Sequence, residues 1–322
     1  ATGAQGRTAE ELKSGLYLPT EDSLTYNGFK SLLESLNVRN WTNITLVPHF
    51  LSINSQFFYC DTPRVDFGNS DASAKEINSW VKKKTNNKID DIISADDINE
   101  QTKIILVNAI YFKGIWVHQF RTELTKNRPF YITKDVKTHV PTMSNKFKYA
   151  HGEVEELNAR IIELPYSDFS MLILLPNEID GLQFLEMNFK QEHIGKVHWQ
   201  YGEIELFLPK FKIEATIHLK EILQEMGMKT MFSDLADFSG IAQAPLQVDK
   251  LIQKAFIEVN EEGSEAAAAT VVGMRIRRMA VQLVTFQVDR PFMFTIQHKP
   301  SKIPVFVGSI RNLQMLYRTD EL

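Results

Sequence analysis

Apolar residues recur along this chain with two periods, one typical of helices and one typical of strands. From Asn27 to Leu36 the apolar positions have the spacing of an amphipathic helix. Ser73 and Glu76 together predict a capping box that begins another helix. A helical stripe is also predicted from Leu219 to Met226, ending at Gly227.

Strands are predicted where an apolar run is continuous or alternates with polar residues. Ile104 to Tyr111 is a continuous apolar run with β-branched residues, which indicates a buried strand. Two runs at 163–166 and 170–176 predict paired strands, the second ending in proline, and 204–208 alternates like a half-buried strand.

One stretch near the C-terminal end, from Ile257 to Met279, has a pattern that fits two conformations. Ser264 followed by Glu265 and four alanines favours a helix by propensity and capping. In an extended chain, however, the alternate residues from Ser264 onward share one face, and all of them are uncharged. They are Ser264, Ala266, Ala268, Thr270, Val272 and Met274. The pattern therefore predicts a segment that is solvated in one state and a buried strand in another.

The same stretch resembles the hinge of inhibitory serpins, a family of serine protease inhibitors. The hinge residues are Glu261, Glu262, Gly263, Ser264, Glu265, Ala266, Ala267, Ala268, Ala269 and Thr270. Downstream, 284–294 is similar to the strand and "RPF" motif after the serpin reactive loop, and 306–310 is similar to the terminal serpin strand. The resemblance runs from Gly3 to about Asn312.

This resemblance implies the serpin fold, which is an α+β fold. That fold has a large central mixed sheet, two smaller sheets, about eight or nine helices and an exposed reactive-centre loop, here at 261–283. We expect one domain over 1–322, in which helix A, strand 6B and most of helix B are missing before the motif at 3–12. Asn108 resembles the polar "shutter" residue of the main sheet, and Trp116 resembles the tryptophan at its "breach". Gln253 stands where many serpins carry a histidine.

The resemblance also implies a mechanism in which the chain is a suicide substrate. An arginine-specific serine protease, trypsin-like or furin-like, attacks the loop and is trapped as an acyl-enzyme when the cut loop inserts into the main sheet. Counting from the hinge places the attacked bond at Arg277-Arg278. The R-x-R-R pattern that begins at Arg275 is instead typical of furin-type cleavage at Arg278-Met279. Both bonds remain candidates for the bond that the protease attacks.

Other functions fit parts of the sequence. A non-inhibitory serpin would act as a binding or storage protein or as a plain protease substrate, and a proprotein would use R-I-R-R only for processing. No enzyme is indicated, because the sequence has no G-x-S-x-G, H-E-x-x-H or paired Cys-x-x-Cys motif. No metal or other cofactor is expected. The basic helix end at Lys82–Lys84 and Lys88 suggests a polyanion such as heparin, but a solvated helix end that compensates the helix dipole is the favoured interpretation.

Charge and composition limit the partners and the compartment. The net charge of -4 argues against general nucleic-acid binding, and the apolar runs are too short to span a bilayer. We expect a monomer, whose partner is the arginine-specific protease that the resemblance implies. Cys60 is the single cysteine, so an internal disulfide is impossible. Glycosylation sequons at Asn40 and Asn43 indicate a secreted glycoprotein. The terminal Thr-Asp-Glu-Leu offers retrieval to the endoplasmic reticulum as the alternative.

Overall fold

The computed structural model describes residues 3–19, 21, 37–42, 46–58, 64–112, 114–261 and 284–313. They form two compact units. The first comprises Ala1–Phe112 with Glu214–Ile257, and the second comprises Lys113–Ile213 with Glu258–Leu322. The single domain expected over 1–322 stays a prediction.

The first unit is built on a four-stranded mixed sheet with the strand order β1-β2-β9-β8. Strand β1 runs antiparallel to β2, and β2 runs parallel to β9. The strands are β1 (Asn37–Thr42), β2 (Ile104–Phe112), β9 (Lys250–Val259) and β8 (Phe211–His218), and the last two, β9 and β8, each cross a boundary between the units. The predicted buried strand at 104–111 is therefore confirmed as β2.

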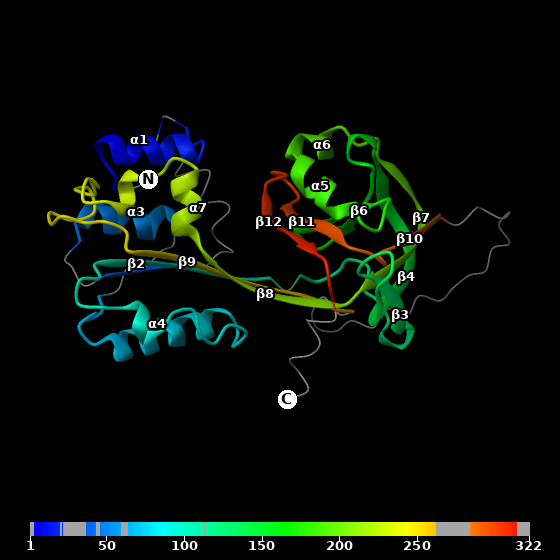
Figure 1. Cartoon of the computed structure of the whole chain (residues 1–322), viewed down its shortest axis with the longest axis horizontal. Helices are drawn as coiled ribbons and strands as arrows, with labels where there is room; N and C mark the ends of the chain where they lie inside the picture. Colours follow the sequence, from blue (N-terminus) through cyan, green and yellow to red (C-terminus); the bar gives the residue numbers. More distant parts are fainter. Residues whose placement is uncertain are drawn as a thin grey trace. The chain divides into compact units, whose positions relative to one another are not determined.

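Helices cover both faces of this sheet, α4 on one side and α1, α3 and α7 on the other (Figure 1). Alternation along β2 explains the two layers, because Ile105 and Val107 pack with α4 whereas Ile104 packs with α1 and α3. The helices are α1 (Gly6–Gly15), α3 (Pro48–Phe58), α4 (Ser70–Lys84) and α7 (Leu219–Glu225), with the 3-10 helices η1 (Ala95–Asp97) and η4 (Thr230–Phe232). Helix α7 ends just before Gly227, as predicted, and that glycine has φ +94°.

The predicted start of α4 at Ser73 is wrong. The helix begins at Ser70, and the side chain of Asn69 caps it by accepting a hydrogen bond from the amide of Ala72. The hydroxyl of Ser73 is buried inside the helix and donates to the carbonyl of Asp66. Asn69 is as good a cap as serine, and the Ser73 hydroxyl cannot cap the helix because it already bonds to the preceding loop.

The second unit contains an eight-stranded sheet with the order β10-β7-β4-β5-β6-β11-β12, and β3 pairs with β4 beside this path. The strands are β3 (Lys126–Tyr131), β4 (Lys137–Val154), β5 (Ala159–Pro165), β6 (Phe169–Pro176), β7 (Gln200–Pro209), β10 (Val284–Gln287), β11 (Phe292–His298) and β12 (Pro304–Ile310). The strands predicted at 163–166, 170–176 and 204–208 are confirmed within β5, β6 and β7. Because the 18 residues of β4 pair with β3, β5 and β7, the two smaller sheets that we expected are joined into one.

Two short helices close the core of the second unit. Helices α5 (Leu182–Asn188) and α6 (Gln191–Gly195) pack on β5, β6 and β11, with the 3-10 helices η2 (Thr122–Leu124) and η3 (Glu155–Leu157) nearby in the chain. The described residues thus contain six α-helices, against the eight or nine expected for the whole chain. The helix predicted at 27–36 lies outside the described residues.

Candidate functional site

In the first unit, two polar side chains lie opposite each other in the middle of a parallel strand pair. Strands β2 and β9 are hydrogen-bonded directly, in register from Ile105 opposite Lys250 to Phe112 opposite Ile257, and this register places Asn108 opposite Gln253. The Oδ1 atom of Asn108 is buried and has no hydrogen-bond partner among the described residues. The two strands are therefore joined without any strand between them, and the polar position between them is only partly satisfied.

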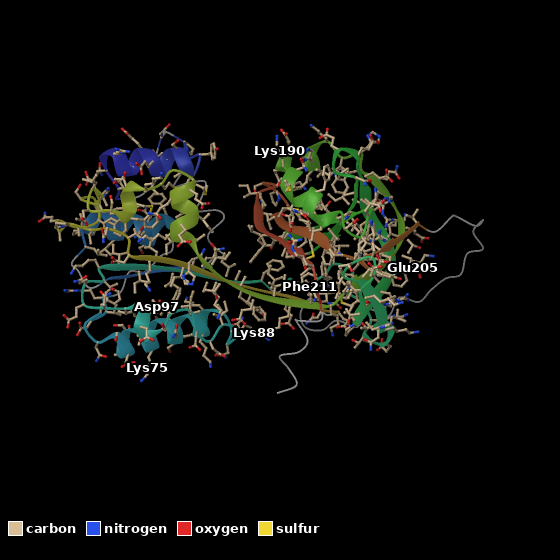
Figure 2. All side chains as sticks on the ribbon, in the orientation of Figure 1. Lys75, Lys88, Asp97, Lys190, Glu205 and Phe211 are labelled. Atoms are coloured by element: carbon tan, nitrogen blue, oxygen red, sulfur yellow. The ribbon has the colours of Figure 1, made fainter. Side chains whose placement is uncertain are left out.

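Lysines on β9 bind the segment between α4 and β2. The Lys250 ammonium lies 2.6 Å from the Asp97 carboxylate, and Lys254 donates to the carbonyl of Asp91 and pairs with Glu214, both at 2.6 Å. Burial raises the pKa of Asp97, but hydrogen bonds from Lys250 and Ser94 outweigh burial and lower it to about 2. Asp97 is labelled in Figure 2. The bonds to Asp97 and Asp91, which lie in the segment that leads into β2, have to rearrange if β2 and β9 separate.

In the second unit, a buried tryptophan binds the backbone that leads into the predicted loop. The indole N–H of Trp116 donates to the carbonyl of Asn260 at 2.9 Å. The ring stacks on Tyr166 with centroids 4.1 Å apart and an interplanar angle of 17°. Trp116 follows β2 by four residues and Asn260 directly follows β9, so this bond ties together the chain segments that leave the parallel pair.

The first residue of the predicted hinge, Glu261, is held by three neighbours. Its side chain is almost fully buried, yet its carboxylate accepts from the Thr125 hydroxyl at 2.7 Å and pairs with the Lys210 ammonium at 2.8 Å. Its carbonyl accepts from the amide of Phe120 at 3.1 Å. Burial raises the pKa of Glu261, but the bonds from Lys210 and Thr125 outweigh burial and hold the pKa below its ordinary value.

The far end of the predicted loop leads into a short parallel strand. Strand β10 begins at Val284 and pairs with β7, with Val284 opposite Ile204. Phe286 is buried, and the guanidinium of Arg160 lies over its ring at 5.1 Å. The described residues on either side of the loop are therefore firmly packed in the second unit.

The structure brings together only part of the predicted site. Trp116 and Glu261 lie in the second unit, and Asn108 lies in the first. Asn40 lies in β1 opposite Leu106. The other predicted residues lie outside the described residues: Asn43, Glu262, Gly263, Ser264, Glu265, Ala266, Ala267, Ala268, Ala269, Thr270, Arg275, Arg277, Arg278 and Met279.

Sequence reasoning missed the partners of Glu261. Lys210 stands in the Pro209-Lys210-Phe211 turn between β7 and β8, where its side chain looks like any solvated lysine. A buried carboxylate requires a cation or hydrogen-bond donors, but the sequence does not indicate which of 36 lysines and arginines supplies the charge.

The described part of the chain offers neither a cluster of metal ligands nor a membrane-spanning helix. It contains no group of three or more His, Cys, Asp or Glu side chains that could hold a metal ion. None of its helices is long and apolar enough to cross a membrane.

Comparison with known proteins agrees with this architecture. The family model "Serpin (serine protease inhibitor)" matches residues 1–313. The chain is 36% identical to Iris of Ixodes ricinus, over 97% of this chain and 88% of that protein. It is 34% identical to the leukocyte elastase inhibitor of Sus scrofa, over 96% and 88%. The crystal structure of Serpin48 from Tenebrio molitor superposes with a TM-score of 0.87 at 31% identity, over 97% of this chain and 87% of that one.

Proposed function

Because the chain belongs to the serpin family of serine protease inhibitors, we propose that it traps arginine-specific serine proteases as covalent acyl-enzymes. The chain is not an enzyme, and the protease supplies the chemistry. The protease serine attacks the carbonyl carbon of a loop arginine, an ester bond forms, and the peptide bond breaks to release a new amino terminus. Water would complete hydrolysis of an ordinary substrate, so trapping requires a competing step.

The observation that carries the proposal is the direct parallel pairing of β2 with β9. A segment that leaves the end of β9 and turns back runs antiparallel to β9. Since β2 is parallel to β9, the same segment is antiparallel to β2 as well. A strand inserted there would bond to both neighbours, and antiparallel pairing is slightly more stable per residue than the parallel pairing it replaces.

The residues after β9 suit such an insertion. About 14 residues from Ser264 to the arginines, at about 3.3 Å each, would move a tethered protease by roughly 45 Å. Their inward alternate positions are uncharged, so no unpaired charge would be buried. Insertion before deacylation would distort the protease and leave the ester intact.

The loop arginines set the proposed target class. Arg277 or Arg278 would enter a protease pocket that holds an acidic group, and Arg275 would fill the additional subsite of a furin-type enzyme. We keep both Arg277-Arg278 and Arg278-Met279 as attacked bonds. A non-inhibitory serpin would be cut at the same arginines without trapping the protease.

Incubation with trypsin and with furin tests the proposal. Denaturing gels should show an SDS-stable complex of the chain with each protease, and mass spectrometry of the C-terminal fragment identifies the bond. Recovery of fully active protease together with cut chain of unchanged heat resistance would refute the inhibitor mechanism.

The compartment is a further part of the proposal. The sequons at Asn40 and Asn43 and the terminal Thr-Asp-Glu-Leu support a glycoprotein that is secreted or is retrieved within the secretory pathway. Expression in insect cells, followed by glycosidase treatment of the medium and of the cell lysate, separates these two locations. An unglycosylated chain confined to the cytosol contradicts both.

A further inference from the structure

The outer face of the strands next to the end of the loop carries a cluster of exposed side chains. Register places Lys146 of β4 opposite Glu205 of β7, Lys148 opposite Glu203, and Ala150 opposite Tyr201. Because directly opposite residues and alternate residues share a face of a sheet, the five side chains other than Ala150 project from one side. We call Lys146, Lys148, Tyr201, Glu203 and Glu205 the loop-side surface. Glu205 is labelled in Figure 2.

The loop-side surface extends past β10 toward the side from which the loop arrives. Strands β10 and β7 are parallel, and the first residue of β10, Val284, lies opposite Ile204. Strand β7 begins four residues earlier, at Gln200. Tyr201 and Glu203 therefore lie beyond the start of β10, on the side where residue 283 joins it.

Most of the loop-side surface is exposed, with Glu205 half-buried. With its neighbours on the same face, which are Glu163 opposite Ala150 and two basic groups on β3, it contains four basic and three acidic groups. Tyr201 is 71% exposed. Lys146 pairs with Glu203 at 3.7 Å, with both side chains about half exposed, whereas Lys148 is exposed and makes no ion pair within the described ranges. Further basic groups lie on the same face of neighbouring β3, namely Lys126 and Arg128.

Chain length places a bound protease near these residues. Six residues separate Arg278 from Val284, so the two are at most about 21 Å apart even in a fully extended chain. A protease domain of about 230 residues has a radius of gyration of about 17 Å. A protease held at either arginine bond therefore has its surface within reach of the strands that flank Val284.

We propose that the loop-side surface is a second contact for the protease, selecting arginine-specific proteases that carry negative charge beside the active-site cleft. This inference rests on the proposed function, because it needs a protease that attacks the loop. Tyr201 supplies a large amphipathic side chain at the edge of the contact. Lys148, which makes no ion pair with any described residue, attracts an acidic partner during encounter and acts mainly on the association rate.

The test compares Lys148→Glu with Lys137→Glu, a matched charge reversal on the same strand. Lys137 is also exposed, and eleven residues of β4 separate it from Lys148, about 36 Å along a straight strand. The probes are an anionic and a cationic trypsin, which share arginine specificity but differ in surface charge. The measurement is the second-order rate constant of loop cleavage, read from the C-terminal fragment at low and high salt.

We expect Lys148→Glu to lower the rate with anionic trypsin about 3- to 10-fold at low salt, and high salt should remove the difference. With cationic trypsin the rate should stay the same or rise. Lys137→Glu should change neither rate by more than about 2-fold. Tyr201→Ala should slow both trypsins, because it removes contact area and leaves the charge unchanged.

The inference is overturned if Lys148→Glu and Lys137→Glu behave alike with both trypsins. Cleavage does not require trapping, so its rate remains readable if the chain is cut without forming a complex. Cleavage without complex formation would refute the proposed inhibitor mechanism alone and would leave the second contact testable. A loop that neither trypsin cuts at Arg277 or Arg278 would refute both.

Discussion

The ammonium of Lys210 lies 2.8 Å from the buried carboxylate of Glu261, the first residue of the predicted hinge. The Thr125 hydroxyl donates a hydrogen bond to the other carboxylate oxygen at 2.7 Å. The loop therefore departs from a point fixed by a charge pair, three residues before Ser264, where the proposed inserting strand begins. This pair links the stability of the second unit to the position of the hinge.

Replacing Lys210 by Met should destabilise the protein. The change leaves the Glu261 carboxylate buried without its cation, which we expect to cost about 1–3 kcal/mol, less than for a fully buried pair because Lys210 is partly exposed. Urea unfolding at pH 7 measures the loss. The double variant Lys210→Met with Glu261→Gln removes the buried charge and should recover part of the stability. A double variant no more stable than Lys210→Met would contradict the assignment of this pair.

The pH dependence of the same pair has a definite sign. The folded-state pKa of Glu261 lies below its ordinary value of 4.5, so the pair contributes fully above about pH 4.5 and its contribution falls as the pH drops through the folded pKa. In Lys210→Met, burial is no longer offset by the cation and the pKa of Glu261 should rise. The stability difference between wild type and variant should therefore shrink from pH 7 to pH 4. A difference that grows toward acid would contradict this interpretation.

Glu11 should give a second acid-sensitive contact, in the first unit. Its carboxylate accepts from the Lys229 amide at 2.9 Å, the Thr230 amide at 2.7 Å and the Thr230 hydroxyl at 2.6 Å. Burial raises its pKa, but these bonds and one from Arg7 outweigh burial and lower the pKa from 4.5 to about 2. The stabilisation is complete above about pH 4.5 and is lost as the pH falls toward 2.

Glu11→Gln should therefore lower the unfolding midpoint at pH 7, and the difference from wild type should narrow between pH 4.5 and pH 3. Thermal unfolding followed by circular dichroism measures both midpoints. The exposed neighbour Glu10→Gln is the matched control and should change the midpoint little at either pH. If Glu10→Gln and Glu11→Gln lower the unfolding midpoint at pH 7 by the same amount, the hydrogen bonds from Lys229 and Thr230 to Glu11 do not contribute to the stability of the protein.

Much of the fold could be predicted from local pattern. The run 104–111 and the strands at 163–166 and 170–176 were readable because apolar residues and terminal prolines determine strand positions locally. The start of α4 could not be predicted in this way, because Asn69 and Ser73 are both good caps. The choice between them depends on the carbonyl of Asp66, which accepts a hydrogen bond from the Ser73 hydroxyl. Competing caps are resolved only by tertiary contacts.

The site was predictable as a motif, but its contacts were not. Resemblance placed the hinge at Glu261, yet the Lys210 and Thr125 contacts join residues 51 and 136 positions away in the chain. Asn108 and Gln253 could each be named, but their direct opposition depends on the register of β2 and β9. Register and long-range ion pairs depend on packing, which a single sequence does not encode locally.

An arginine at Ala268 should convert the inhibitor into a substrate. Ala268 is one of the uncharged alternate positions, so insertion of Ala268→Arg would bury an unpaired charge and lose the competition with deacylation. Ala267→Arg is the matched control, because Ala267 would be on the opposite face of an extended chain and an arginine there should still permit trapping. The number of inhibitor molecules consumed per trypsin inactivated should rise at least about 10-fold for Ala268→Arg alone. SDS-stable complexes in normal yield from Ala268→Arg would count against strand insertion.

Single arginine replacements should separate the two candidate bonds. If furin is attacked through Arg278-Met279, Arg278→Ala should reduce furin inhibition at least about 100-fold, because the acidic pocket of the protease loses its partner. Trypsin inhibition should survive in that variant if Arg277-Arg278 serves trypsin, and Arg277→Ala should give the inverse result. Rate constants of inhibition measure both effects, and the mass of the C-terminal fragment shows whether it begins at Arg278 or at Met279. If Arg278→Ala loses inhibition of furin and of trypsin equally, the two proteases do not use different bonds, and Arg278-Met279 is the bond that both attack.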